Sequence, residues 1–168
     1  MKLLDSTIIE SLMHSENSEV PKVPDYYDYL NLESFTHIAT DGKTLSALAK
    51  YSGTAARFGG CILDLSSLQE ISAAVLMIFL RCERIGLVHF SSLKTLDLAC
   101  ARMLVKAVTK GTQMINFGFG FDLFNLAPEV IAELSMATHY GWTDDGVFYL
   151  FNEDVYKECA AGDYLDLI

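Results

Sequence analysis

The chain has little positive charge and no long apolar run. Lys and Arg account for 12 of its 168 residues, against 22 Asp and Glu, which gives a formal net charge of -10 at pH 7. Because a protein that binds nucleic-acid phosphates needs a basic surface, this balance argues against a nucleic-acid partner. The longest apolar run, residues 73–80, is far shorter than the roughly 20 residues that cross a bilayer. The sequence therefore predicts no membrane partner either.

Cysteine and histidine are scarce, and their spacing fits neither a disulfide framework nor a metal site. The four cysteines include no C-x-x-C pair, and the four histidines lie far apart in the sequence, so no metal-binding set is predicted. Asp5 and Glu10 interrupt the first apolar residues, which argues against a secretory signal peptide. We therefore expect a cytoplasmic protein with reduced cysteines, in which Cys82 and Cys100 are buried in the core.

An internal repeat is the main pattern in the sequence. Apolar residues recur with spacings of two, three and three residues in four copies: Leu30, Leu32, Phe35 and Ile38; Leu63, Leu65, Leu68 and Ile71; Val88, Phe90, Leu93 and Leu96; and, more weakly, Ile115, Phe117, Gly120 and Leu123. The first two positions alternate as in a strand, and the wider spacing that follows indicates a turn. Each copy therefore predicts a strand that ends in a turn.

A helix is predicted after each of these strands. Counted from the last apolar residue of each copy, mostly apolar residues follow at the fourth, seventh and eleventh positions, which share one helical face. Glycine at the fifteenth position (Gly53, Gly86 and Gly111) is predicted to close the first three helices. The predicted helix caps are Thr40 or Asp41, Ser72, Asp97 and Asn125, with Pro128 in the first turn of the fourth helix.

The predicted fold class is α/β. Because one strand–helix unit cannot bury its apolar side alone, we expect about four units to stack as a short solenoid, with a parallel sheet and the helices on one side. The chain is long enough for a single domain over residues 1–168. Residues 1–26 are predicted to form an N-terminal cap with a short helix opened by Thr7, and residues 28–141 the repeats. Residues 142–168 are predicted to form an acidic C-terminal cap that includes a closing strand at residues 146–151.

Two family resemblances follow from these segments. The segments at residues 29–38 and 62–71 resemble bacterial leucine-rich repeats, and Ala47-Leu48-Ala49-Lys50-Tyr51-Ser52-Gly53 resembles the helix ending of such repeats. That resemblance implies a protein-binding scaffold without catalytic residues. Residues 63–72 also resemble the central strand and loop of STAS domains, which implies a regulatory partner-switching protein. In that family a serine is phosphorylated after an aspartate, whereas Ser72 and Ala73 stand at those two positions here.

The sequence predicts no enzyme, no cofactor and no metal site. Gly118-Phe119-Gly120 begins like a phosphate-binding loop, but Leu123 stands where the dinucleotide fingerprint has its third glycine. Asp64 and His89 occupy the same position of adjacent predicted strands, so a triad of Ser66, His89 and Asp64 is arithmetically possible. A solvated polar strand face explains these three residues equally well, and we expect no catalytic residues.

The best site hypothesis is the outward face of the predicted sheet. Its polar positions form two rows, one of Asn31, Asp64, His89 and Asn116 and one of Glu33, Ser66, Ser91 and Gly118. Together they predict an exposed concave surface that binds a protein partner. Residues 111–168 hold ten acidic residues and one basic residue, Lys157, which favours a basic partner. The same charge leaves an alternative open, an acidic inhibitor or immunity-type protein that neutralises a basic toxin or nuclease.

Overall fold

The computed structural model describes residues 1–15, 29–55, 61–82, 85–110, 114–117, 125–137, 139–142 and 148–151. These residues form a mixed α/β fold. Its helices are α1 (Ser6–Ser15), α2 (Gly42–Ala55), α3 (Ala73–Leu80), α4 (Leu98–Lys110) and α5 (Pro128–Leu134). Its strands are β1 (Leu3–Leu4), β2 (Tyr29–Asn31), β3 (His37–Ile38), β4 (Cys61–Asp64), β5 (Ile85–Phe90), β6 (Met114–Phe117), β7 (His139–Trp142) and β8 (Phe148–Phe151).

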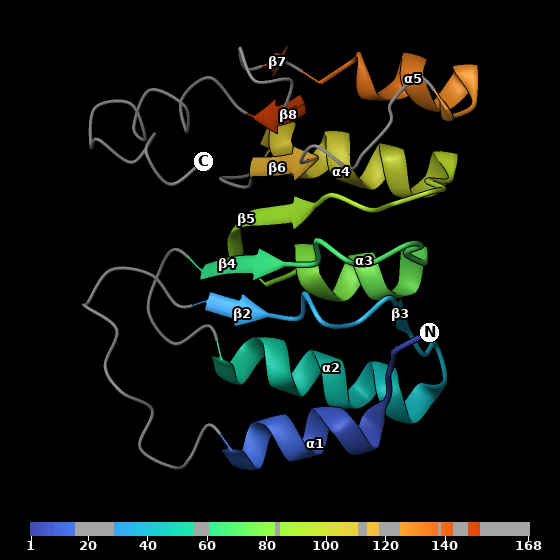
Figure 1. Ribbon diagram of the computed structural model, residues 1–168. Helices are drawn as coiled ribbons and strands as arrows, with labels where there is room; N and C mark the ends of the chain where they lie inside the picture. Colours follow the sequence, from blue (N-terminus) through green and yellow to red (C-terminus); the bar gives the residue numbers. More distant parts are fainter. Residues whose placement is uncertain are drawn as a thin grey trace.

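The four repeat strands lie side by side in one parallel ladder. Strands β2, β4, β5 and β6 pair in this order, and each pair is parallel (Figure 1). The register sets Leu30 beside Leu63, Leu63 beside Val88, and Val88 beside Ile115. These residues stand at the first apolar position of the four copies. The prediction that equivalent residues of successive copies occupy neighbouring strands in one direction is therefore confirmed.

Two antiparallel strands complete the sheet beyond the repeats. Strand β8 pairs antiparallel with β6, and β7 pairs antiparallel with β8 at the edge. The predicted closing strand at residues 146–151 is confirmed over Phe148–Phe151. Strand β7 was not expected, because His139-Tyr140-Gly141-Trp142 lacks the alternation of apolar and polar residues that marks a half-buried strand. The acidic residues 152–168 lie outside the described residues.

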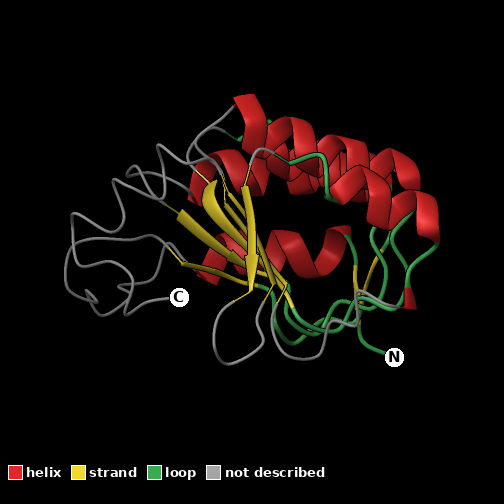
Figure 2. Ribbon diagram, turned by 90° about the horizontal axis from the view of Figure 1, so that it is seen from above, coloured by secondary structure: helices red, strands yellow, loops and turns green. Residues whose placement is uncertain are grey.

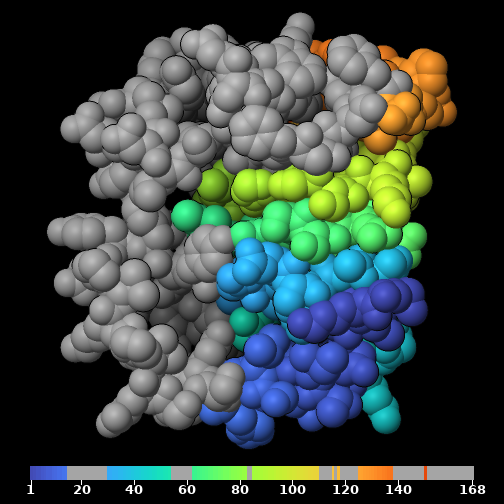
Figure 3. Space-filling model, in the orientation of Figure 1, coloured from blue at the N-terminus to red at the C-terminus, as the bar shows by residue number. Residues whose placement is uncertain are grey.

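The core lies between the sheet and the helices. Helices α1 to α5 stack in chain order along the sheet, and the view down the stack shows most of them beside one face of the strands (Figures 1 and 2). The residues at the first two apolar positions of each copy are exposed by 2% or less: Leu30, Leu32, Leu63, Leu65, Val88, Phe90, Ile115 and Phe117. The rings of Phe90 and Phe117 stack with their centroids 5.9 Å apart. Figure 3 shows the described repeats as successive bands, each beside the next.

Four of the helices begin with the same side-chain cap. A side-chain oxygen accepts a hydrogen bond from the backbone N–H three residues further on at Asp5, Asp41, Ser72 and Asp97. This bond satisfies one of the amides that a helix start leaves without a partner. The caps at Asp41, Ser72 and Asp97 are confirmed. The predictions for Thr7 and Asn125 are wrong, because Asp5 caps α1 and Ala127 precedes α5 without a side-chain cap bond, although Pro128 does open α5.

The buried positions of each helix lie at fixed distances from the residue that precedes the helix. Their distance from the last apolar residue of the preceding turn varies. In all five helices the third, fourth and seventh residues after Asp5, Asp41, Ser72, Asp97 or Ala127 are buried or half-buried. The predicted helix positions are therefore only partly right, and Gly42 and Ala49 are exposed. The physical reason is an insertion. Two residues, Ala39 and Thr40, separate Ile38 from the cap at Asp41, whereas Ser72 and Asp97 directly follow the last apolar residue of their copies.

The glycine predictions for the helix ends are wrong wherever the structure describes them. Gly53 lies inside α2, which continues to Ala55, and Gly86 lies inside strand β5. Helix α3 ends at Leu80, and the N–H of Arg81 bonds to the carbonyl groups of the preceding turn. Gly111 lies outside the described residues. Helix length here follows the available buried face, so a fixed glycine position does not mark the end.

The turns repeat the same backbone hydrogen bonds and extend the stack to the N-terminus. Gln69 N–H donates to the Thr36 carbonyl at 3.0 Å, and Lys94 N–H donates to the Gln69 carbonyl at 2.8 Å. Thr36 N–H donates in turn to the Lys2 carbonyl at 2.9 Å, and β1 runs parallel to β3. Residues 1–15 therefore continue the turn hydrogen bonds and place helix α1 beside the others, which confirms a short helix near the N-terminus.

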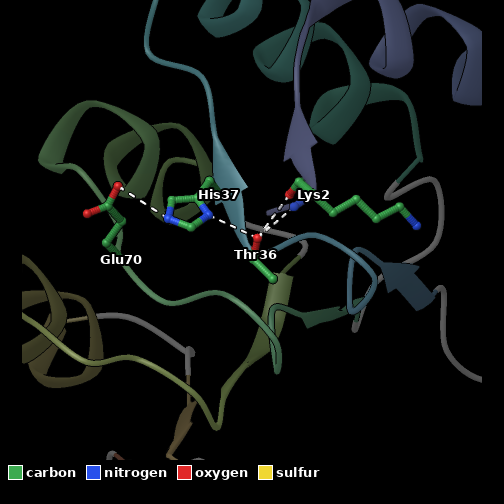
Figure 4. Close-up of polar contacts among 4 residues, drawn as sticks. All are labelled: Lys2, Thr36, His37 and Glu70. Atoms are coloured by element: carbon green, nitrogen blue, oxygen red, sulfur yellow. Dashed lines mark hydrogen bonds and ion pairs between the residues drawn. The ribbon is translucent and has the colours of Figure 1, made fainter.

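Side chains reinforce this attachment of the N-terminal segment (Figure 4). Thr36 Oγ1 accepts a hydrogen bond from the Lys2 backbone N–H at 2.9 Å and donates one to the Lys2 carbonyl at 3.2 Å. The same oxygen lies 2.9 Å from His37 Nδ1, and His37 Nε2 lies 3.8 Å from a carboxylate oxygen of Glu70. The contact ties β1 to the turn before α3. Within the described part of the chain, no helix is long and apolar enough to cross a membrane.

Candidate functional site

The parallel register assembles the first predicted row of polar residues. Asn31 pairs with Asp64, Asp64 with His89, and His89 with Asn116 on neighbouring strands. Each of them follows a buried residue of the core, and successive side chains of a strand point to opposite faces. The row therefore lies on the face of the sheet that points away from the core. The side chain of Asn116 is not among the described ones, and Gly118 lies outside the described residues.

Exposure differs along the two rows. Asn31 and Glu33 are exposed, and Ser66, His89 and Ser91 are half-buried. Asp64 is only 7% exposed, so the prediction of an exposed row is wrong for this residue. Its Oδ1 accepts a hydrogen bond from the Ser66 backbone N–H at 2.9 Å. The carboxylate therefore folds back onto its own turn.

Asn31 and Asp64 share a structural role that the sequence interpretation missed. Asn31 Oδ1 accepts a hydrogen bond from the Glu33 backbone N–H at 3.0 Å, as Asp64 does from Ser66. Side chains of Asn and Asp commonly make this bond to the amide two residues on and so end a strand in a turn. The signal was available in the sequence, because Asn or Asp recurs at this position in three of the four copies.

His89 bonds to Ser91, just after its own strand β5, and is the register partner of Asp64 on β4. His89 Nε2 and Ser91 Oγ are 2.7 Å apart. Burial lowers the pKa of His89, while the negative charge of Asp64 raises it, and burial has the larger effect. The imidazole is therefore neutral at pH 7. The structure pairs His89 with Ser91 and the Ser66 amide with Asp64, so the arithmetically possible triad of Ser66, His89 and Asp64 is not formed.

An apolar row accompanies the polar rows on the same face, and this row was not predicted. Tyr29 pairs with Ile62, Ile62 with Leu87, and Leu87 with Met114. These residues stand two positions before the Asn31 row, and the side chains of Ile62 and Leu87 are half-buried. The outward face therefore offers apolar surface beside hydrogen-bonding groups, a combination that suits contact with another protein.

Basic residues are absent from the outward positions of the repeat strands. The outward positions of β2, β4, β5 and β6 and of the turn residues 33, 66 and 91 include two acidic residues, Glu33 and Asp64, and no Lys or Arg. The helices carry exposed side chains of both signs, with Lys43, Lys50, Arg102 and Lys106 among the basic ones and Glu10 and Glu129 among the acidic ones. Arg102 Nε lies 3.4 Å from the carboxylate of Glu133 on α5. The outward positions of these four strands and their turns therefore differ from the helices in carrying no basic residue.

The two described cysteines differ in burial. Cys100 is fully buried, as predicted, whereas Cys82 is only half-buried. Burial raises the pKa of the Cys100 thiol to about 12, with a further contribution from the carboxylate of Asp97. The thiol therefore stays protonated and unreactive at neutral pH. Among the described residues, no group of three or more His, Cys, Asp or Glu is placed to hold a metal ion.

Comparison with known proteins gives no relative from which a function can be transferred. No protein-family model matches the chain. No curated protein and no solved structure matches it either. The function must therefore be inferred from the residues and their arrangement.

Proposed function

We propose that the chain is a short leucine-rich-repeat-like solenoid that acts as a protein–protein interaction scaffold and has no catalytic activity. Its binding surface is the outward sheet face formed by Asn31, Glu33, Asp64, Ser66, His89, Ser91 and Asn116, together with the neighbouring apolar row. We place the protein in the cytoplasm, which agrees with the two described cysteines being free thiols.

The shared register is the observation that carries this proposal. It sets equivalent positions of successive copies next to one another across four parallel strands. The caps of Ser72 and Asp97 and the turn bonds of Asn31 and Asp64 also recur at equivalent positions. Units that repeat in this way present regularly spaced side chains on one continuous face, as repeat proteins do when they bind partners.

The chemistry of the face favours a partner with a basic segment. Glu33 is exposed, Asp64 adds a second negative charge, and no Lys or Arg stands at an outward position of these strands and turns. Electrostatic complementarity would steer a basic loop or helix toward this face. Ile62 and Leu87 supply apolar contact beside the charges.

Quantitative affinity purification from the native host tests the proposal. The baits are the wild type, the double variant Glu33→Gln/Asp64→Asn, and the matched control Glu129→Gln, which removes an exposed carboxylate from helix α5. Asparagine at position 64 keeps the oxygen that caps the turn, as Asn31 does in the preceding copy. We expect one partner with a basic segment to be lost from the double variant and retained by the control. Equal recovery of every bound protein by all three baits would overturn the proposal.

A second candidate function rests on the distribution of charge along the chain. Residues 111–168 carry ten acidic residues and one basic residue, which suits an acidic inhibitor or immunity-type protein that neutralises a basic toxin or nuclease. Such a complex should weaken steeply with salt, because exposed charges are screened over about 10 Å at 0.1 M salt. The affinity is therefore measured at about 50 mM and at about 500 mM sodium chloride, a range that includes 0.1 M. This candidate fails if the affinity for the partner is the same at both concentrations.

The STAS-like alternative remains a third proposal, with weaker support. Its resemblance covers residues 63–72 and gives no account of why the copies at residues 30 and 88 share their register. Ser72, which stands in place of the family's aspartate, serves as the cap of α3. Incorporation of phosphate at Ser66 or Ser72 by a co-encoded kinase would favour this alternative over the scaffold.

A further inference from the structure

We propose that His37 makes the attachment of the N-terminal segment, residues 1–15, to the repeats dependent on pH. The protonated ring completes the hydrogen bonds between Thr36 and Lys2, whereas the neutral ring competes for one of them. This inference goes beyond the proposed function and does not depend on it, since it concerns the attachment of β1 and not the outward sheet face.

Thr36 is the residue at which the N-terminal segment is bound to the repeats (Figure 4). Its backbone N–H donates to the Lys2 carbonyl at 2.9 Å, and its Oγ1 accepts from the Lys2 backbone N–H at 2.9 Å. The same Oγ1 donates to the Lys2 carbonyl at 3.2 Å. Close by, the Ala39 N–H donates to the Leu4 carbonyl at 2.9 Å. Detachment of the segment would break these bonds together.

The ring of His37 lies between the Thr36 hydroxyl and a carboxylate (Figure 4). His37 Nδ1 is 2.9 Å from Thr36 Oγ1, and His37 Nε2 is 3.8 Å from a carboxylate oxygen of Glu70. The His37 side chain is 24% exposed, so water reaches it only in part. The backbone sets this arrangement, because β3 pairs with β1 and the Gln69 N–H donates to the Thr36 carbonyl.

Only the protonated ring satisfies all of these contacts. A hydroxyl carries one hydrogen, a neutral imidazole carries one on either of its nitrogens, and an ionised carboxylate only accepts. Because the Thr36 hydroxyl donates to the Lys2 carbonyl, His37 Nδ1 needs a hydrogen of its own to bond to Oγ1. The carboxylate of Glu70 favours a hydrogen on Nε2 as well. Both nitrogens carry a hydrogen in the protonated ring alone.

The neutral ring leaves one contact unmade. With its hydrogen on Nε2, His37 accepts the Thr36 hydroxyl hydrogen at Nδ1 and withdraws it from the Lys2 carbonyl. With its hydrogen on Nδ1, the ring turns a lone pair toward the carboxylate of Glu70. In the detached state water can bond to the hydroxyl and to the ring, so this conflict is absent. Attachment and protonation therefore favour each other, and the segment should be held more firmly in acid.

Other charged groups surround His37 in the described part of the chain. The Lys2 side chain points away from the ring (Figure 4), and its Nζ lies 5.0 Å from the centre of the Phe35 ring. Ordinary carboxylates and lysines keep their charge between about pH 5.5 and about pH 8, whereas an α-amino group, as on Met1, ordinarily titrates near the upper end of this range. The segments beside His37 also carry the charged residues Asp5, Glu33, Asp41, Lys94 and Asp97.

Hydrogen exchange followed by NMR tests the inference. The amides of Thr36 and Ala39 report on attachment, because they bond to the N-terminal segment, and the amide of Lys94 is the reference, because it makes the equivalent bond to Gln69. Each rate is divided into the rate of the unfolded chain at the same pH, which gives a protection factor. We expect the protection of Thr36 and Ala39, relative to Lys94, to be about fivefold higher at about pH 5.5 than at about pH 8, as one net hydrogen bond would give.

Four variants separate the ring of His37 from the other titrating groups. His37→Gln keeps the amine of Met1, and Thr36→Val removes the hydroxyl that links the ring to Lys2. Both should lose the pH dependence. Thr36→Ser keeps the hydroxyl and His89→Gln removes a histidine of the sheet face, so both should retain it. The inference is overturned if the wild type shows no pH dependence, or if His37→Gln or Thr36→Val shows the same dependence as the wild type.

Discussion

Substitution of Phe90 by alanine should reveal how strongly the fold depends on the stacked repeats. The ring of Phe90 is 0% exposed and stacks on Phe117 with a centroid separation of 5.9 Å. Phe90 occupies the second apolar position of its copy, beside the equivalent positions of neighbouring copies. Truncation removes the buried ring and its contact with Phe117 and leaves a cavity in the core.

The expected cost is about 3–5 kcal/mol of the free energy of unfolding, the range for a fully buried Phe truncated to Ala. For a domain of this size each kcal/mol lowers the Tm by about 2–4 °C, so the Tm should fall by about 6–20 °C. Phe90→Leu keeps most of the apolar volume and loses the ring stacking, so it should cost only about 1 kcal/mol.

Urea unfolding followed by circular dichroism measures these changes. The matched control is Met136→Ala, since Met136 is 72% exposed and its truncation should stay within about 0.5 kcal/mol of the wild type. The reasoning is refuted if Phe90→Ala is destabilised by no more than the control, because the ring would then not be part of a continuous core.

Three further predictions follow from the caps, the buried thiol and the half-buried histidine. Asp97→Ala should cost about 1 kcal/mol in urea unfolding, because it removes the oxygen that accepts the hydrogen bond of the Cys100 N–H, whereas Asp97→Asn should cost much less. Iodoacetamide at about pH 8 should leave Cys100 unmodified in the native protein, because the pKa of its thiol is raised to about 12. The same reagent should label Cys100 in urea, and mass spectrometry measures both outcomes. Labelling of Cys100 in the native protein would contradict this prediction. Folding stability should decline as pH falls below the ordinary His pKa of 6.5, since the unfolded chain then binds the proton more readily than buried His89 does. Urea midpoints in His89→Gln should show a smaller decline, and an equal decline would contradict the assignment.

The strand ladder could be predicted from the sequence because its signal is local and repeated. Alternating apolar residues such as Leu30 and Leu32 specify which side of a strand is buried, and equivalent residues of successive copies must then meet in the same core. Caps such as Ser72 and Asp97 were also predictable, since a short polar side chain before an apolar segment satisfies the free amides of a helix start.

The positions of the helices relative to their strands could be predicted only in part. Two extra residues in the first unit, Ala39 and Thr40, shift the buried face of α2 relative to Ile38. The predicted helix positions were counted from Ile38 and so included these two residues. In the folded chain they lie in the turn, and the helix begins after its cap. Glycine gave a poor guide to the helix ends, because a helix continues as long as its apolar face is covered by neighbours.

The candidate site shows the same division. The sequence alone determined that Asn31, Asp64, His89 and Asn116 are equivalent residues of one repeated pattern, since equivalence follows from spacing. Only the tertiary structure decided that Asp64 turns onto the Ser66 amide and is nearly enclosed, that His89 bonds to Ser91, and that β8 and then β7 extend the sheet beyond β6 through antiparallel pairs. The burial and hydrogen bonding of a side chain depend on neighbours that come from distant parts of the chain. The spacing of residues along the sequence does not specify those neighbours.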